Sequence, residues 1–282
     1  MTASILAEAI RMLQDGGITN ARQEAGWLLN QILNSDANTG AGQPRRPAAD
    51  LSPEQEKQLR SRLARRLAGE PLQYIMGNTD FHCLQLDVGP GVLIPRPETE
   101  QLVEIAIGLY PGHGDICDVC TGSGAIALAL AATFPQARVT ATDISTRALA
   151  WARQNASRLQ LANVAFYQGD LLAPTPPAAR FDLLTANPPY IAPDDYMRLE
   201  RTVKDHGPPE ALIAHDHGLA IIKRLARAAR TRLSPAAWLT CEIGDTQGSP
   251  VAEYLCRQGY LNVDIKRDFA GRDRFAVAQQ PA

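Results

Sequence analysis

The chain has 282 residues, a formal net charge of -2 at pH 7 and a hydrophobic fraction of 45%. This length suits one large or two ordinary domains, and the charge argues against a protein that binds mainly by neutralising phosphates. No stretch reaches the roughly 18 apolar residues of a membrane span, and the first residues lack the pattern of a signal peptide. An odd number of cysteines, five in all, suits a reducing compartment, so we expect a soluble cytoplasmic protein.

Residues 1–80 are predicted to form a small helical domain. Apolar residues such as Ile5, Ala9 and Leu13 recur at helical spacing, and Ser52-Pro53-Glu54-Gln55 has the pattern of a helix start with a capping box. Residues 35–50 are expected to form a polar loop. The third predicted helix carries Lys57, Arg60, Arg62, Arg65 and Arg66. These five side chains form either a solvated face or a docking site for an acidic partner or RNA. We expect this domain to recognise a macromolecule rather than to catalyse a reaction.

Residues 81–95 form the predicted junction between the two domains. Residues 81–88 alternate well enough for a strand or a hairpin arm. Pro97 suits the first position of a helix, with glutamates following in its first turn. Arg96 stands between two prolines, so it lies either on a plain hinge or on a stiff charged segment beside a binding pocket. The second domain is expected over residues 96–282.

Residues 116–143 have the pattern of a nucleotide-binding α/β unit. A buried strand over 116–119 leads into a glycine-rich turn and then into an apolar helix from Ala125, which is the first unit of a Rossmann-like fold. The turn contains Cys120, Thr121, Gly122, Ser123 and Gly124. Asp143 ends the next predicted strand, nineteen positions after Gly124. An acid at that place can accept hydrogen bonds from both hydroxyls of a ribose.

Both NAD and S-adenosylmethionine carry such a ribose, and two features favour S-adenosylmethionine. Asp118, expected at the mouth of the turn, suits an ammonium or sulfonium group rather than a pyrophosphate. Asp170 and Leu171, after the third strand, can supply an acceptor and an apolar contact for adenine. Cys117 and Cys120 have the spacing of a redox pair or half a zinc site, but we favour Cys117 as strand filler because no second pair exists.

A buried strand predicted over residues 181–186 ends abruptly in Asn187-Pro188-Pro189-Tyr190. The two prolines fix their φ angles and remove two amide donors, so this corner cannot continue as strand or helix. It presents a carboxamide, a tertiary-amide carbonyl and an aromatic ring at the carboxyl end of a strand, where open α/β sheets bind ligands. This combination indicates a pocket for a flat nitrogen nucleophile. The competing interpretation is an ordinary proline-rich turn.

The remaining residues are expected to complete the sheet. Residues 191–217 form a predicted substrate-facing loop, in which His206, His215 and His217 are interpreted as surface histidines rather than metal ligands. A helix over 219–233, a strand over 238–244 and a helix over 251–258 follow. Two last strands, near 263–265 and 275–278, are joined by a short turn that implies an antiparallel pair. The predicted fold is therefore α/β: a mostly parallel Rossmann-like sheet of the methyltransferase type, with one antiparallel strand near its edge.

Segments 65–77, 93–100, 121–124 and 187–190 together resemble the release factor glutamine methyltransferase family (PrmC/HemK). The Asn-Pro-Pro-Tyr motif alone is shared with adenine-N6 and guanine-N2 methyltransferases. The Arg-Pro-Glu-Thr-Glu segment and the helical N-terminal domain are more discriminating. The resemblance implies a class I methyltransferase domain, S-adenosylmethionine as methyl donor, and the glutamine of the Gly-Gly-Gln loop of class I peptide chain release factors as acceptor. We also expect a monomer that contacts neither nucleic acid nor a membrane directly.

These considerations assign the site residues. The cofactor-binding set is Asp118, Cys120, Thr121, Gly122, Ser123, Gly124, Asp143, Asp170, Leu171 and Asn187. The catalytic and substrate-binding set is Asn187, Pro188, Pro189 and Tyr190, with Arg96 added on the substrate side and no metal. We expect the Asn187 side-chain oxygen and the Pro188 carbonyl to accept the two N–H bonds of the substrate amide while Tyr190 stacks on its plane.

Three positions depart from the family pattern. Cys120 stands where Gly is usual, Gly207 where Glu is usual, and His217 where Asp is common. A sister family that methylates a glutamine of a large-subunit ribosomal protein often has Cys at the first of these positions. The open alternatives are therefore that ribosomal-protein methyltransferase, an adenine-N6 nucleic-acid methyltransferase, and a cofactor-binding scaffold without catalysis.

Overall fold

The computed structural model describes residues 2–35, 51–198, 204 and 207–282. The chain forms two compact units, Met1–Gly77 and Asn78–Ala282. The first unit thus ends at Gly77 rather than at residue 80, and the segment 81–95, interpreted above as a junction, lies within the second unit. The loop predicted over residues 35–50 falls almost wholly outside the described residues.

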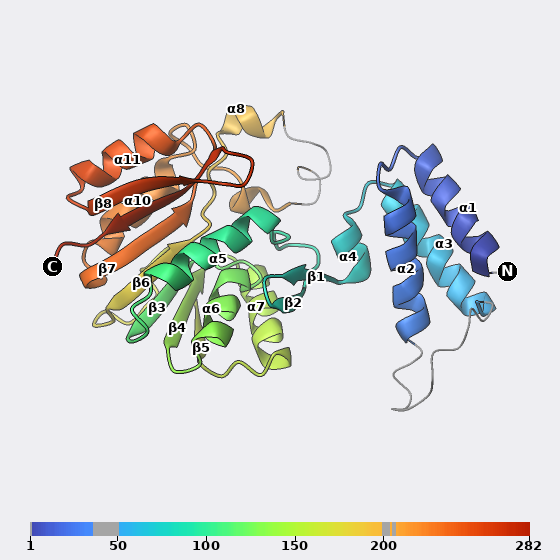
Figure 1. The fold of residues 1–282 in the computed structure, drawn as a ribbon, viewed down its shortest axis with the longest axis horizontal. Coiled ribbons are helices and arrows are strands. Elements are labelled where there is room, and N and C mark those ends of the chain that lie inside the picture. Colours follow the sequence, from blue (N-terminus) through green and yellow to red (C-terminus); the bar gives the residue numbers. More distant parts are fainter. Residues whose placement is uncertain (1, 36–50, 199–203, 205–206) are drawn as a thin grey trace. The chain divides into compact units, whose positions relative to one another are not determined.

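The described residues of the first unit form four helices (Figure 1): α1 (Thr2–Asp15), α2 (Ala21–Ser35), α3 (Pro53–Leu67) and the short α4 (Leu72–Met76). The predicted capping box at the start of α3 is present. The Ser52 hydroxyl accepts a hydrogen bond from the Gln55 amide at 3.2 Å, and the Gln55 side chain accepts one from the Ser52 amide at 2.8 Å. Apolar side chains from α1, α2 and α3 then bury each other, which holds the helices together.

The basic side chains of α3 contact residues of their own unit. Arg66 Nε lies 2.6 Å from Glu24 Oε2 on α2, and both side chains are mostly buried. The other contacts join Arg60 to Glu8, Arg62 to Gln31 and Arg65 to Glu70. Four of the five basic side chains are therefore engaged within the unit, and three of them, Arg60, Arg65 and Arg66, pair with an acid of the same unit.

The Arg66–Glu24 pair should stabilise the first unit measurably. Changing Glu24→Gln removes the charge from a mostly buried hydrogen-bonded pair, which we expect to cost about 1.5–3 kcal/mol. Changing Glu8→Gln removes the exposed partner of Arg60 and should cost less than about 1 kcal/mol. Amide hydrogen exchange in α2 and α3 measures both effects. Equal protection in the two variants would contradict this ranking.

The second unit is built on a seven-stranded sheet with the strand order β5-β4-β3-β6-β7-β9-β8. Its strands are β3 (Asp115–Val119), β4 (Arg138–Asp143), β5 (Val164–Gln168), β6 (Phe181–Ala186), β7 (Leu233–Glu242), β8 (Leu261–Arg267) and β9 (Asp273–Gln279). Only the pairs that involve β9 are antiparallel within this sheet of described strands. The predicted mostly parallel sheet with one antiparallel strand near the edge is confirmed. Before it, β1 (Asn78–Phe81) and β2 (Leu84–Asp87) form a hairpin, so the single strand or arm expected over residues 81–88 instead contains the turn and the second strand.

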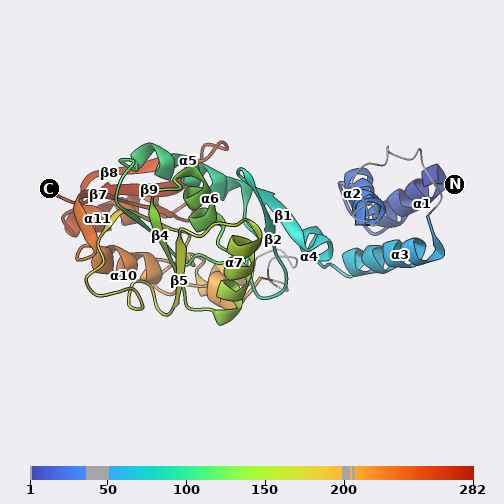
Figure 2. The ribbon, with the colours of Figure 1, turned by 90° about the horizontal axis from the view of Figure 1, so that it is seen from below.

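Helices cover both faces of this sheet (Figure 2). On one face, α5 (Pro97–Leu109), α6 (Ala125–Thr133) and α7 (Thr146–Arg158) contribute to one buried apolar cluster. On the other face, α10 (Ala220–Ala229) and α11 (Gly248–Arg257) contribute to a second cluster. The loop after β6 carries α8 (Pro193–Tyr196) and a 3-10 turn at Pro209–Ala211. The sheet is thus buried on both faces, as a parallel sheet requires.

The start of β7 differs from the sequence-based expectation. The preceding helix was expected to extend to Leu233, but α10 ends at Ala229 and β7 already begins at Leu233. The pairing with β6 shifts between Leu233 and Trp238, and Ala236 has a positive φ of 62°. This irregularity accommodates Pro235 inside a strand, which regular pairing would not.

The four central parallel strands end at one level. Val119 pairs with both Thr142 and Ala186, and Ala186 pairs with Cys241. The residues that follow these four are Cys120, Asp143, Asn187 and Glu242. One edge of the sheet therefore gathers a glycine-rich turn, two acids and a carboxamide.

Candidate active site

The glycine-rich turn that follows β3 adopts left-handed backbone conformations. Cys120, Gly122 and Gly124 have φ values of 59°, 59° and 86°. The Thr121 amide donates to the Thr142 carbonyl at 3.0 Å, and the Gly122 amide donates to Asp143 Oδ2 at 2.8 Å. The turn is therefore attached to the end of β4. The left-handed φ at Cys120 explains why glycine suits this position, since a Cβ costs roughly 1–2 kcal/mol there.

Asp143 is held as an acceptor at the end of β4. Its second oxygen, Oδ1, accepts the Ser145 amide at 2.9 Å. Burial raises the pKa of Asp143, while the amides of Gly122, Ile144 and Ser145 favour the carboxylate and oppose this rise. A carboxylate keeps further lone pairs after accepting two bonds, so Asp143 can still accept from a ligand hydroxyl.

A cavity of about 340 Å³ lies over the turn and the corner after β6. Its size falls within the roughly 300–1,000 Å³ of small-molecule sites. The predicted site residues that line it are Cys120, Thr121, Gly122, Ser123, Asp143, Asp170, Leu171, Asn187 and Pro189. Both halves of the predicted site, the turn and the proline corner, thus face the same space.

Asp118 lies elsewhere than at the expected mouth of the turn. It is fully buried within β3 and does not belong to the cavity lining. Its carboxylate accepts the hydroxyls of Thr121 at 2.6 Å and Thr185 at 2.8 Å. The position inside the strand, one residue before its end, explains this difference. Asp118 therefore supports the turn from within the sheet.

Four more predicted residues also lie outside the cavity lining: Gly124, Pro188, Tyr190 and Arg96. Gly124 caps the start of α6, and Arg96 precedes the first residue of α5. Pro188 is buried, and the Tyr190 ring packs against the apolar cluster on the α10 face. Asp170 lines the cavity, but its carboxylate is also paired with Arg224.

A hydrogen-bonded network that starts in the cavity lining and runs inward joins the proline corner to two residues that sequence reasoning missed. Asn187 Nδ2 lies 3.2 Å from Thr99 Oγ1, and the Thr99 hydroxyl donates to Glu242 Oε2 at 2.7 Å. The Tyr190 hydroxyl donates to Glu242 Oε1 at 3.0 Å. The available signal for Glu242 was an acid at the end of a buried strand. For Thr99 it was its place inside the Arg-Pro-Glu-Thr-Glu segment.

Glu242 is almost completely buried, with 1% of its surface exposed. Burial raises its pKa, whereas hydrogen bonds from Thr99 and Tyr190 and the charges of Arg96 and Arg274 lower it. The same site raises the pKa of Tyr190, first by burial and then by the nearby Glu242 carboxylate. The tyrosine therefore serves as a hydroxyl donor to Glu242.

The backbone of the corner is fixed by the loops around it. Gln247 Nε2 donates to the carbonyls of Tyr190 at 2.9 Å and His217 at 3.1 Å. A Cβ at Gly218 would lie only 2.0 Å from the Tyr190 carbonyl oxygen, and Gly218 itself has a φ of 82°. Only glycine allows this approach. The corner is therefore positioned by residues beyond its own sequence motif.

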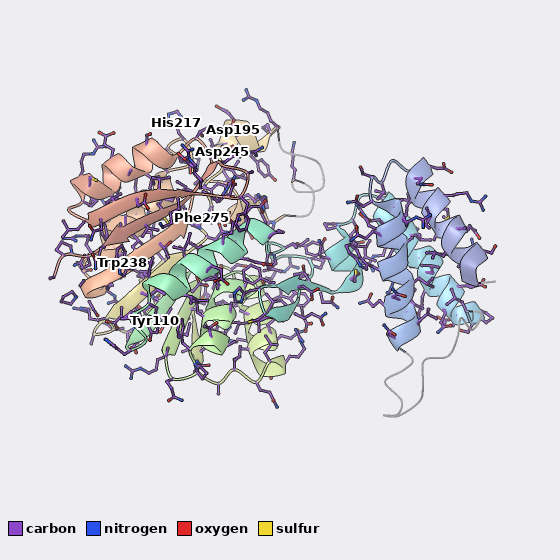
Figure 3. All side chains as sticks on the ribbon, in the orientation of Figure 1. Tyr110, Asp195, His217, Trp238, Asp245 and Phe275 are labelled. Carbon is purple, nitrogen blue, oxygen red and sulfur yellow. The ribbon has the colours of Figure 1, made fainter. Side chains whose placement is uncertain are left out.

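The loops that surround the site gather at one end of the sheet. In Figure 3, Asp195, His217 and Asp245 lie at this end, whereas Tyr110 and Trp238 lie toward the other. His215 and His217 are both exposed, while His206 lies outside the described residues. Across the parts of the chain that the structure describes, no group of three His, Cys, Asp or Glu side chains is placed to hold a metal ion. Within the same parts, no helix is long and apolar enough to cross a membrane.

Two residues that line the cavity have hydroxyl groups that could bond to a ligand. The hydroxyls of Ser123 and Thr142 are buried against the cavity, and neither has a hydrogen-bond partner within the described part of the chain. A buried hydroxyl without a partner is unfavourable. A Cβ at Gly122 would meet no atom nearer than Val92 Cγ2 at 3.9 Å, so the missing side chain leaves open space above the turn. These features fit a nucleoside with a polar tail.

Comparison with known proteins agrees with this geometry. A family model described as "Methyltransferase domain" matches residues 116–207, and one described as "PrmC N-terminal domain" matches residues 4–77. Among solved structures, the ribosomal protein L11 methylase from Lactobacillus delbrueckii subsp. bulgaricus is 23% identical, with a TM-score of 0.51 over 70% of this chain and 84% of that chain. The hMettl16 catalytic domain in complex with MAT2A 3′UTR hairpin 6 is 18% identical, with a TM-score of 0.56 over 91% of each chain. These structures share the fold.

Curated relatives match over much longer stretches. The release factor glutamine methyltransferase of Koribacter versatilis is 38% identical over 97% of this chain and 96% of the relative. That of Aliivibrio fischeri is 35% identical over 98% of this chain and 96% of the relative. That of Vibrio cholerae is 42% identical over 77% of this chain and 76% of the relative.

Fold, cavity and comparisons define a methyltransferase with a Rossmann-like catalytic domain. The sequence identity to the curated relatives and the share of each chain that is covered also define the family. The chain belongs to the release factor glutamine methyltransferase family.

The buried carboxylate of Asp118 makes a prediction about pH. Burial raises its pKa to about 7, above the roughly 3.9 of an unfolded aspartate. Between these values the folded chain retains a proton that the unfolded chain releases, so the free energy of unfolding falls as the pH rises. Between pH 4 and pH 8, the free energy of unfolding of the wild-type protein should fall by on the order of 3 kcal/mol relative to that of Asp118→Asn.

Urea denaturation of both proteins at several pH values measures this difference, because pH effects from other groups are common to both. Asp194→Asn on α8 is the control, since Asp194 is exposed and should give no comparable pH-dependent difference. The prediction would be contradicted if the difference in the free energy of unfolding between wild type and Asp118→Asn stayed constant across this pH range.

Proposed function

We propose that this protein transfers a methyl group from S-adenosylmethionine to the side-chain amide nitrogen of the glutamine in the Gly-Gly-Gln motif of class I peptide chain release factors. The observation that carries the proposal is that Asn187 lines the same cavity as the glycine-rich turn and Asp143. The relatives that share the chain's full length are named for this reaction, which supports the same acceptor. We propose that the protein acts as a cytoplasmic monomer.

The cofactor supplies an electrophilic methyl group on a sulfonium. Asp143 would accept the ribose hydroxyls, in keeping with its place at the end of the second central strand. The free hydroxyls of Ser123 and Thr142 would donate to polar groups of the cofactor. Asp170 and Leu171, which line the cavity, would contact the adenine.

The acceptor is a carboxamide nitrogen, whose lone pair is delocalised into its carbonyl group. Asn187 Oδ1 and the Pro188 carbonyl would accept hydrogen bonds from its two N–H groups and turn the lone pair toward the methyl group. The new N–C bond would form as the sulfur–methyl bond breaks, and one amide proton would be released to solvent. Glu242 is not suited to act as the base, because it lies outside the cavity lining and already accepts two hydroxyl donors. Catalysis would come mostly from alignment and fixed dipoles.

The first unit would recognise the release factor. It coincides with the region matched by the "PrmC N-terminal domain" family model. It would therefore contribute to affinity for the protein substrate, while the second unit carries the methyltransferase chemistry. Arg96, which precedes the first residue of α5, would contact the substrate. Tyr190, which packs against the cluster on the α10 face and donates to Glu242, would hold the corner in place rather than stack on the substrate amide.

Methyl transfer from tritiated S-adenosylmethionine tests the proposal directly. The purified protein is offered a class I release factor, large-subunit ribosomal proteins and nucleic acid side by side. Label is expected on the release factor alone, and a release factor with Gln→Ala in its Gly-Gly-Gln motif should remain unlabelled. Label on a ribosomal protein or on nucleic acid instead would assign the chain to one of the alternative acceptors.

Two variants should separate chemistry from cofactor binding. Asn187→Ala removes a group that aligns the acceptor, so we expect turnover to fall by about a hundredfold or more with a much smaller change in cofactor affinity. Asp143→Ala removes the ribose acceptor and should weaken cofactor binding by roughly tenfold to a hundredfold. Calorimetric titration with S-adenosylhomocysteine and steady-state kinetics measure the two effects. Near-normal turnover of Asn187→Ala would exclude its assigned role.

A further inference from the structure

Asn187 is the last member of a directional chain of hydrogen bonds that begins at a buried carboxylate. Glu242 Oε2 accepts the Thr99 hydroxyl at 2.7 Å, and Thr99 Oγ1 lies 3.2 Å from Asn187 Nδ2. Glu242 and Thr99 are 1% and 3% exposed. The three residues come from the end of β7, the first turn of α5 and the end of β6.

The chemistry of these groups fixes the direction of each bond. An ionised carboxylate can only accept, and a threonine hydroxyl has a single proton. Once Thr99 donates that proton to Glu242, its oxygen has only lone pairs left to offer. A carboxamide that meets a pure acceptor must present its NH₂ side. The side-chain oxygen of Asn187 must therefore face away from Thr99.

The hydrogen bonds that Glu242 accepts fit its ionised form. The Tyr190 hydroxyl donates to its other oxygen at 3.0 Å, so both carboxylate oxygens are used as acceptors. A protonated Glu242 would turn its own proton toward one of these donors and break the pattern. Burial raises the pKa of Glu242, and the charges of Arg274 on β9 and Arg96 before α5 oppose this rise in part.

We infer that Glu242, acting through Thr99, is a positioning residue that decides which side of the Asn187 carboxamide faces the acceptor nitrogen. The inference rests on the proposed function, because it specifies how the same site holds a substrate amide. If Asn187 were reversed, its NH₂ would face the NH₂ of the substrate, and two donors cannot pair. The same carboxylate also holds the Tyr190 hydroxyl, so one group positions both ends of the proline corner.

Four variants test this role with steady-state kinetics on a release factor. Thr99→Val keeps the shape of the side chain but removes the hydroxyl, so kcat should fall by about tenfold to a hundredfold. KM for the release factor and affinity for S-adenosylhomocysteine should change much less. Thr99→Ser keeps the hydroxyl and should restore most of kcat. Thr240→Val is the matched control, because Thr240 is a buried threonine of β7 whose hydroxyl has no partner among the described residues.

Glu242→Gln probes the direction of the chain. Its amide group can donate to Thr99, which then has a proton free for the Asn187 oxygen. This would allow Asn187 to reverse, so kcat should fall as in Thr99→Val even if the fold is unchanged. Thermal denaturation of all four variants identifies any loss of folding. Wild-type kcat in a folded Thr99→Val or Glu242→Gln protein would overturn the inference while the proposed function stood.

A second measurement does not depend on the acceptor. In the NMR spectrum of ¹⁵N-labelled protein, the side-chain NH₂ resonances of Asn187 are identified as those missing from the spectrum of Asn187→Ala. We expect them to shift and to exchange faster with water in Thr99→Val and Glu242→Gln, but not in Thr240→Val. Unchanged resonances would overturn the inference. Should the wild-type protein fail to methylate the release factor, the proposed function fails, and this spectrum still decides whether Glu242 orients Asn187.

Discussion

The register of four adjacent parallel strands determines where the polar groups of the site stand. Val119, Thr142, Ala186 and Cys241 of β3, β4, β6 and β7 lie at one level, so the residues that follow them reach the same end of the sheet. A slip of one residue in any of these strands would turn its side chains to the opposite face. The apolar clusters on both faces oppose such a slip, so packing in the core holds the polar groups of the candidate site in register.

Much of this arrangement could be predicted from local sequence. The capping box at Ser52, the glycine-rich turn and the strand that stops at Asn187 each depend on a few neighbouring residues. Such signals report backbone conformations that only certain residues allow. The order of strands and helices followed from alternating periodicities. The class of fold therefore follows from the sequence alone.

Other features depend on contacts between distant parts of the chain. Thr99 and Glu242 are separated by 143 positions, and no local pattern links them. Asp118 was misplaced because one position along a strand decides between the buried interior and the open edge. The start of β7 was missed because Pro235 is tolerated only through the irregular pairing with β6. The partners of the α3 arginines likewise lie on α1, α2 and the segment after α3.

The two acids at the ends of β4 and β7 show how one edge of a sheet can hold groups with separate tasks. Asp143 is bound by backbone amides and faces the cavity, so it remains available to a ligand. Glu242 is bound by side-chain hydroxyls and is withdrawn behind the cavity, so it organises other residues. The departure at Cys120 is tolerated between them because its thiol packs against the apolar cluster below the turn, which offsets the cost of its left-handed backbone.

The most direct test of this account is a high-resolution structure, preferably by neutron diffraction, with S-adenosylhomocysteine and a peptide that contains the Gly-Gly-Gln motif. We expect Asn187 Oδ1 to lie about 2.7–3.2 Å from the side-chain nitrogen of the peptide glutamine, with the deuterated NH₂ of Asn187 directed at Thr99. A glutamine bound elsewhere, or an Asn187 whose NH₂ faces the peptide, would contradict the account.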